Sequence, residues 1–113
     1  MPYINITTNV KVSDSTEEKV KSKLGEAIKI LGKSENWLML NLSDNQRMHF
    51  QGDNSNPMAM VEVKLFGKAS SRAYDEMTSA TTDIISNELN VAPSKIYIKY
   101  EEVSYWGWNG NNF

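Results

Sequence analysis

The sequence predicts one α+β domain built from two similar strand–helix–strand units. Two observations lead to this fold class: apolar residues change from alternating to helical spacing and back, and the same succession then repeats. The chain has 113 residues, of which 40% are hydrophobic and 23% charged. A chain of this size can bury a core without disulfides or structural metals. We therefore treat residues 1–113 as a single domain.

The first predicted element is a strand over residues 3–10, which are rich in Ile, Thr and Val. Pro2 precedes it directly. Proline has no N–H to donate to a sheet, but it is tolerated at the first residue of a strand. Removal of Met1 would also leave a secondary amine at the end of this rigid element.

A helix and a second strand complete the first unit. Apolar residues spaced i, i+4, i+7, i+8 and i+11 form one helical stripe, made of Val20, Leu24, Ala27, Ile28 and Leu31. Ser15 and Glu18 have the spacing of a capping box, and Gly32 is a typical stop signal. Alternation of leucines over residues 38–42 then predicts a strand.

The second unit repeats this order after a polar, turn-rich segment over residues 43–57. Within that segment, "MHF" is interpreted as a short edge strand or a hairpin arm. Alternating apolar residues predict a strand that contains Ala59, Val61, Val63 and Leu65. A helix is predicted over Ser70–Leu89 from a stripe of Ala73, Met77, Ala80 and Ile84, and Pro93 prevents its continuation. The last strand covers "KIYIKYEEV", residues 95–103.

Each unit is expected to form a right-handed crossover with parallel strands. Side by side, the two βαβ units make a four-stranded mixed sheet with both helices on one face. The other face carries Tyr, Thr, Lys and Glu among apolar residues, so it must be solvated or covered by another copy. The aromatic tail "SYWGWNGNNF" is expected to pack against something, with a neighbouring subunit as one candidate.

Composition excludes several classes of function. A net charge of −2 and a pI near 5.4 argue against a nucleic-acid-binding protein, which needs a basic face. The absence of cysteine excludes disulfides, thiol nucleophiles and thiolate metal sites. The carboxylates lack metal-ligand spacing and no glycine-rich phosphate loop occurs, so neither a metal nor a cofactor is expected.

The chain shows no signal-peptide pattern at its start, and no stretch approaches the roughly 18 apolar residues of a membrane helix. We therefore expect a soluble cytoplasmic protein without a membrane partner. A role outside the cell would require secretion without a cleaved leader.

Several short motifs occur in a recognisable order: "MP" at the start, "GK" after the first helix, "MHFQGDNSNP", "FGK", "IYIKY", "GWNG" and a final "NF". Together they resemble the macrophage migration inhibitory factor family of the tautomerase superfamily, across essentially the whole chain. The resemblance implies a trimer of pseudo-symmetric subunits. It also implies an isomerase that catalyses keto–enol tautomerisation of aromatic pyruvates, such as phenylpyruvate, and of dopachrome-type compounds.

In that family the general base is the N-terminal proline, which corresponds here to Pro2 after loss of Met1. An ordinary α-amino group has a pKa of roughly 7.7–8.0, and a secondary amine is more basic. An apolar pocket and nearby cations would lower the pKa towards working pH, where a base is efficient. Lys33 matches the lysine that holds the substrate carboxylate. Without the resemblance, Lys33 would be interpreted as a cation favoured at a helix C-terminus.

The resemblance assigns further residues to the site. Tyr97 matches a tyrosine that the adjacent subunit contributes, and Phe66 matches a residue whose backbone contacts the substrate. Trp37 takes the place of a tyrosine at the pocket mouth. Trp108 and Phe113 match the aromatic tail that lines the site. Each of these side chains also fits an ordinary packing role.

Two features depart from the family pattern. Lys99 stands where the family has asparagine, and strand alternation directs it the same way as Tyr97. Lys99 therefore either adds a second cation near the amine, which would lower the pKa of Pro2 further or tighten carboxylate binding, or turns to solvent. Phe66 and Trp106 are larger than the aliphatic residues expected there, which predicts a tighter pocket.

Three functions follow as alternatives. The favoured one is a cofactor-independent tautomerase of an aromatic 2-oxo acid, with sites at the subunit interfaces of a homotrimer, because both Pro2 and Lys33 are present. The second is a cytokine-like ligand of a host-type receptor, secreted without a leader, whose catalytic pocket is vestigial. The third is a ferredoxin-like assembly module without chemistry.

Overall fold

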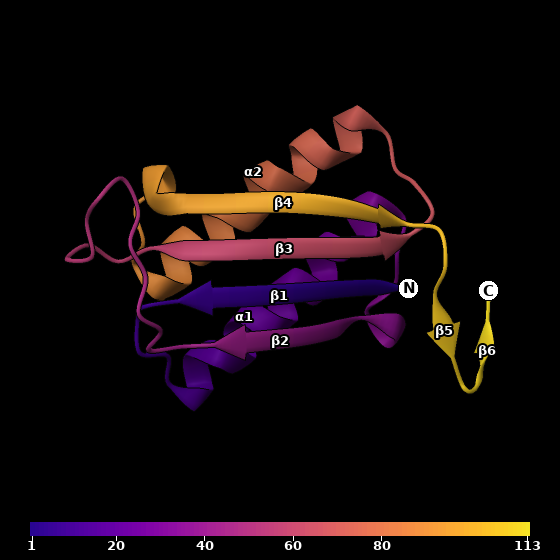
Figure 1. The fold of residues 1–113 in the computed structure, drawn as a ribbon, viewed down its shortest axis with the longest axis horizontal. Helices are drawn as coiled ribbons and strands as arrows, with labels where there is room; N and C mark the ends of the chain where they lie inside the picture. Colours follow the sequence, from indigo (N-terminus) through magenta and orange to yellow (C-terminus); the bar gives the residue numbers. More distant parts are fainter.

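The computed structural model describes all of residues 1–113 and has two layers, a four-stranded sheet and two helices that cover one of its faces (Figure 1). The main elements are β1 (Pro2–Thr8), α1 (Asp14–Ala27), β2 (Met39–Ser43), β3 (Ala59–Phe66), α2 (Ser71–Leu89) and β4 (Ile96–Val103). A small hairpin of β5 (Gly107–Trp108) and β6 (Asn111–Asn112) ends the chain. Neither long helix combines the length and apolar character that a membrane-crossing segment requires.

The strand order is β2-β1-β3-β4. β1 and β2 are parallel, β3 and β4 are parallel, and the two units meet where β1 runs antiparallel to β3. The predicted α+β fold, a mixed sheet of two βαβ units with both helices on one face, is thus confirmed. The antiparallel register sets Pro2 opposite Leu65, at the end of the sheet where β3 and β4 finish.

The core lies between the sheet and the helices. Inward-facing residues of β1 and β3, such as Ile4 and Val63, are almost fully buried. All five residues of the predicted α1 stripe are buried as well, namely Val20, Leu24, Ala27, Ile28 and Leu31. Burial of each Val, Leu or Ile side chain favours folding by about 1.5–3 kcal/mol, so this core holds both helices against the sheet.

Two local predictions about the helices are wrong. The side chain that caps α1 is Ser13, whose hydroxyl oxygen accepts a hydrogen bond from the Thr16 N–H at 3.2 Å, rather than Ser15. Ser15 lies inside the first turn, where its side chain contacts that of Ser13. The chain leaves α1 through a short 3-10 turn that ends at Gly32, as predicted, with a left-handed φ of 73°.

The buried stripe of α2 is displaced from the predicted one. Its fully buried residues are Met77, Thr81, Ile85 and Leu89, whereas Ala73, Ala80 and Ile84 pack against the edge of the core. The helix ends because Asn90 adopts a left-handed conformation with φ 55°, three residues before Pro93.

The "MHF" segment forms no strand. Phe50 instead pairs with Asp53 across a tight turn in which Gln51 and Gly52 have positive φ values. The two residues exchange backbone hydrogen bonds of 2.9 and 3.0 Å. The alternative of a minimal hairpin is therefore nearer to the structure than that of an edge strand.

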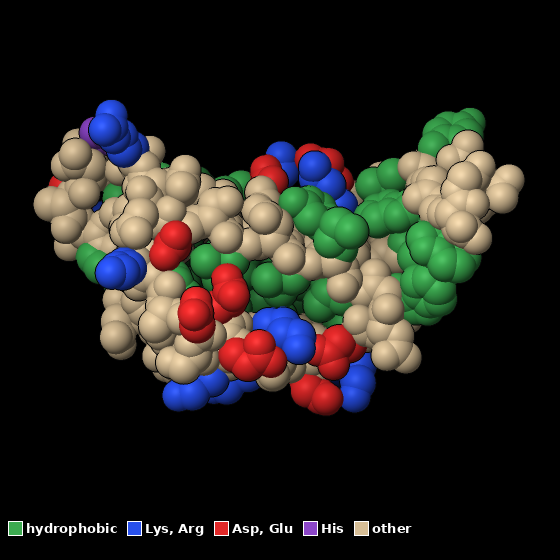
Figure 2. Space-filling view, turned by 90° about the horizontal axis from the view of Figure 1, so that it is seen from below, with side chains coloured by type: hydrophobic (Ala, Val, Ile, Leu, Met, Phe, Trp, Pro, Cys, Tyr) green, Lys and Arg blue, Asp and Glu red, His purple; other side chains and the backbone are tan.

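The face of the sheet opposite the helices carries polar side chains together with the exposed Met39 and Tyr97, the mixture expected from the sequence. Asn41 of β2 donates a hydrogen bond to Asn5 of β1 at 2.8 Å, and Asn5 donates to Glu62 of β3 at 3.2 Å. Lys99 of β4 lies 3.9 Å from Glu62 and 3.1 Å from Glu101. Figure 2 shows this face from the side as a hollow between two raised ends, with hydrophobic side chains gathered at one end. That end carries the C-terminal tail (Figure 1).

Candidate functional site

The candidate site lies at the start of β1, where the backbone of β3 fixes the N-terminus. The Met1 carbonyl oxygen accepts a hydrogen bond of 3.0 Å from the Phe66 N–H. The other side of the same residue is also occupied, because the Lys33 ammonium donates to the Phe66 carbonyl oxygen at 2.9 Å. Phe66 therefore joins the N-terminus and Lys33 through its own backbone.

The N-terminal amine is in an environment that disfavours its charged form. The pKa of the Met1 amine lies below its ordinary value, first because burial penalises the ammonium and second because Lys33 repels it. The expectation for the Pro2 amine concerns the chain after loss of Met1 and stays a prediction.

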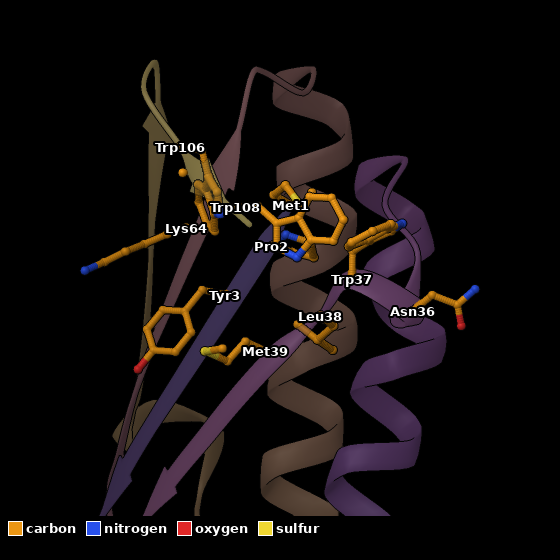
Figure 3. Close-up of a pocket in the computed structure, with 11 residues that line it drawn as sticks. Met1, Pro2, Tyr3, Asn36, Trp37, Leu38, Met39, Lys64, Trp106 and Trp108 are labelled. Atoms are coloured by element: carbon orange, nitrogen blue, oxygen red, sulfur yellow. The ribbon is translucent and has the colours of Figure 1, made fainter. Parts of the chain in front are cut away.

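A pocket of about 510 Å³ opens beside the N-terminus (Figure 3). Its walls come from the start of β1, from the segment around β2's first residue, from β3 and from the tail. The lining residues are Met1, Pro2, Tyr3, Asn36, Trp37, Leu38, Met39, Lys64, Trp106, Gly107 and Trp108. All three tryptophans of the chain belong to this set, so aromatic rings form a large part of the pocket wall.

The C-terminal tail builds one wall of the pocket from its own chain. The ring of Trp108 meets that of Trp37 edge to face, with centroids 5.0 Å apart, and stacks with that of Phe113 at 6.4 Å. Phe113 also lies 5.6 Å from Phe66. The tail therefore makes aromatic contacts within the subunit, but Trp108 and Phe113 remain 51% and 53% exposed. A neighbouring subunit as the partner of this exposed surface stays a prediction.

Pro2, Lys33, Trp37, Phe66, Trp108 and Phe113 thus gather at one end of the molecule, but Tyr97 does not join them within one chain. Tyr97 pairs with Met60, which precedes Leu65, the partner of Pro2, by five residues of β3. At about 3.3 Å per residue, this offset is about 17 Å along the strands. The ring of Tyr97 packs instead against Phe50, with centroids 4.7 Å apart.

Lys99 follows Tyr97 on the open face of the sheet, as strand alternation predicted. Its ammonium is half-exposed and forms ion pairs with Glu101 and Glu62. Within one chain, Lys99 is therefore neither beside the N-terminal amine nor free in solvent. A role for Tyr97 in the pocket requires the corresponding residue of a neighbouring subunit.

Sequence reasoning did not single out Tyr3, Met39 or Lys64 as lining residues. They face the same side of three neighbouring strands, with Met39 opposite Tyr3 and Tyr3 opposite Lys64. The available sequence signal for Lys64 was strand alternation, which places it on the same face of the strand as Phe66. No group of three or more His, Cys, Asp or Glu side chains is arranged to hold a metal ion.

The chain resembles known proteins along its full length. Residues 1–113 match the model of the family described as "Macrophage migration inhibitory factor (MIF)". The chain is 30% identical over 116 residues to the macrophage migration inhibitory factor of Xenopus laevis, covering 100% of this chain and 99% of that protein.

Solved structures of similar proteins have the same fold. The Leishmania major MIF2 structure superposes with a TM-score of 0.93 at 29% identity, covering 100% of this chain and 97% of that one. A homologue from Prochlorococcus marinus gives a TM-score of 0.84 at 32% identity, with 98% of each chain covered. Both the sequence match and the shared fold extend over essentially all residues, and the chain therefore belongs to the macrophage migration inhibitory factor family.

Proposed function

We propose that this protein is a cofactor-independent keto–enol tautomerase of aromatic 2-oxo acids such as phenylpyruvate, with the Pro2 amine as general base after removal of Met1. The observation that carries the proposal is the paired use of the Phe66 backbone by the N-terminus and by Lys33, beside an aromatic pocket. Membership in the family supports the same chemistry.

In this proposal the Met1 carbonyl oxygen stands in for an oxygen of the substrate carboxylate. It accepts from the Phe66 N–H at 3.0 Å, close to the Lys33 ammonium that the Phe66 carbonyl holds. Loss of Met1 frees that N–H and exposes the amine of Pro2. A carboxylate then takes one hydrogen bond from the Phe66 N–H and one from Lys33, and charge-assisted bonds of this kind are the stronger ones.

The reaction needs only a proton transfer. The neutral Pro2 amine removes a proton from the carbon beside the ketone, so that a C–H bond breaks and the electron pair moves to the carbonyl oxygen. Return of the proton to that oxygen gives the enol and regenerates the amine. Burial and Lys33, the two causes that lower the pKa of the Met1 amine, would keep Pro2 neutral closer to working pH.

We also propose that the site is completed in a homotrimer. The uncovered face of the sheet supports this, because Met39 and Tyr97 are large hydrophobic side chains that remain 68% and 60% exposed there. In the trimer, Tyr97 and Lys99 of one subunit would approach the Pro2 pocket of the next. For Tyr97, the offset of about 17 Å along the strands prevents this contact within one chain.

The test keeps the N-terminus native. Mass spectrometry first establishes removal of Met1, and phenylpyruvate tautomerisation is then compared between that protein, Pro2→Gly and a form with an N-terminal extension. We expect both changes to abolish most of the activity, whereas Pro57→Gly, a control at an exposed loop proline, keeps it. Equal rates in all four proteins would refute the role of Pro2.

The receptor-ligand alternative stays a prediction. It differs from the enzyme in one measurable respect, since binding to a receptor does not require a free secondary amine. Receptor binding that survives Pro2→Gly, in a protein that shows no tautomerase activity even with its native N-terminus, would favour that alternative.

A further inference from the structure

We propose that Lys64 is a specificity-determining residue that selects aromatic 2-oxo acids with a second anionic group at the far end of the ring. The orientation of the ligand in this inference rests on the function proposed above. The inference concerns the outer part of the same pocket, which the base and the carboxylate-binding groups do not fill.

The charge of the pocket points to an anionic ligand end. Lys64 is the only charged side chain among the eleven lining residues, and no carboxylate is among them. Aromatic side chains make up much of the remaining wall. A ligand with a planar apolar body and an anionic outer end therefore matches this lining better than a cationic or fully apolar ligand.

The position of Lys64 gives the direction in which such a ligand would extend. Lys64 lies opposite Tyr3 of β1. It precedes Phe66 on β3 by two residues, so the Cα atoms of Lys64 and Phe66 are about 7 Å apart. In Figure 3 the Lys64 side chain lies on the same side as Trp106, and its ammonium points outward, away from Pro2. A ligand anchored at Phe66 and running along the tryptophans would bring its outer end towards that ammonium.

The ammonium of Lys64 is only weakly engaged. Its ion-pair partner is Glu101, at 3.8 Å, and its side chain is 36% exposed. Glu101 has a closer partner in Lys99, at 3.1 Å on its other carboxylate oxygen. Exposed pairs of this kind contribute at most about 1 kcal/mol, so a ligand anion competes with a weak partner.

Binding is measured by tryptophan fluorescence of the protein that has lost Met1, because all three tryptophans line the pocket. The probes are phenylpyruvate and para-carboxyphenylpyruvate at low ionic strength. We expect the wild type to bind the second probe about two- to fivefold more tightly, the range of an exposed ion pair. Lys64→Met abolishes this preference, so that the two probes bind this variant with similar affinity.

Matched variants separate Lys64 from the other cations. Lys64→Arg restores the preference, and Glu101→Gln increases it by removing the competing carboxylate. Lys11→Met is the control for net charge, because Lys11 is exposed and lies beyond the far end of β1. Thermal melting of each variant verifies that it is folded.

Three results would overturn the inference: no preference in the wild type, a preference that survives Lys64→Met, or a preference lost through Lys99→Met alone. Tryptophan fluorescence reports binding whether or not the protein converts the probe. Failure of the proposed function, seen as no tautomerisation of either probe, is therefore distinguishable from failure of the specificity assigned to Lys64.

Discussion

Replacement of Lys33 by methionine tests how the N-terminal site is held together. Methionine keeps most of the length of the stem but removes the ammonium, and with it the 2.9 Å hydrogen bond to the Phe66 carbonyl oxygen. Under the proposed function the same change also removes one of the two groups that bind the substrate carboxylate. Both effects weaken the site without opening a cavity.

The magnitude follows from the kind of interaction that is lost. A hydrogen bond to a charged group contributes about 1.5–3 kcal/mol, which corresponds to a reduction of kcat/KM by about 10- to 150-fold. The charge has a second effect. Because Lys33 lowers the pKa of the terminal amine, its removal should raise the pKa of the base. Activity of the variant is then suppressed at low pH and recovers only as the pH rises through that higher value.

The assay is the pH dependence of kcat/KM for phenylpyruvate with the N-terminus native. Lys29→Met is the matched control, since Lys29 lies four residues earlier, in the 3-10 turn, and pairs with Glu26 in solvent. It should change neither the rate nor the profile. A Lys33→Met protein with an unchanged rate, or with a profile displaced to lower pH, would refute this account of the site.

Three further predictions concern stability and charge. Ser13→Ala should lower the free energy of unfolding by about 1 kcal/mol, whereas Ser15→Ala should have a smaller effect in the same denaturant titrations, because Ser13 caps α1. Thr81→Val should raise the melting temperature, since the buried Thr81 hydroxyl has no hydrogen-bond partner, and an unchanged or lower value would contradict this reading. Lys99→Asn should raise the pKa of Glu101 in NMR titrations, because Lys99 is the main cause of its lowering. In the proposed trimer it should also raise the apparent pKa of the base in pH–rate profiles.

The fold was predictable from the sequence because its signals are local and repeated. The α1 stripe from Val20 to Leu31 marked the buried face correctly, since every buried position of that stripe carries an apolar residue. The α2 stripe was misplaced because the buried position at Thr81 carries a polar residue, which hydrophobic spacing assigns to the surface. Capping by Ser13 rather than Ser15 depends on where the chain enters helical geometry. Two closely spaced serines make that starting residue ambiguous in the sequence.

The candidate site was predictable only in part, since it depends on contacts between distant residues. The docking of Trp108 on Trp37 and of Phe113 on Phe66 joins segments far apart in the chain, and no spacing rule encodes it. The lining role of Lys64 depends on the register between β1 and β3, which the sequence leaves open. The motif resemblance supplied Pro2 and Lys33 because those residues follow recognisable local signals.

Removal of Met1 would change the polar balance of the site as well as expose an amine. In the structure both polar groups of the Phe66 backbone have partners, the N–H in Met1 and the carbonyl oxygen in Lys33. Without Met1 the N–H loses its acceptor, and an unsatisfied donor costs about 1–3 kcal/mol where water does not replace the partner. Under the proposed function, a substrate carboxylate would restore that bond beside the Lys33 ammonium, which the carbonyl oxygen already holds. Met1, which blocks the proposed base, therefore also occupies the position that a substrate carboxylate would take. Removal of Met1 would thus both free the Pro2 amine and open the carboxylate-binding position.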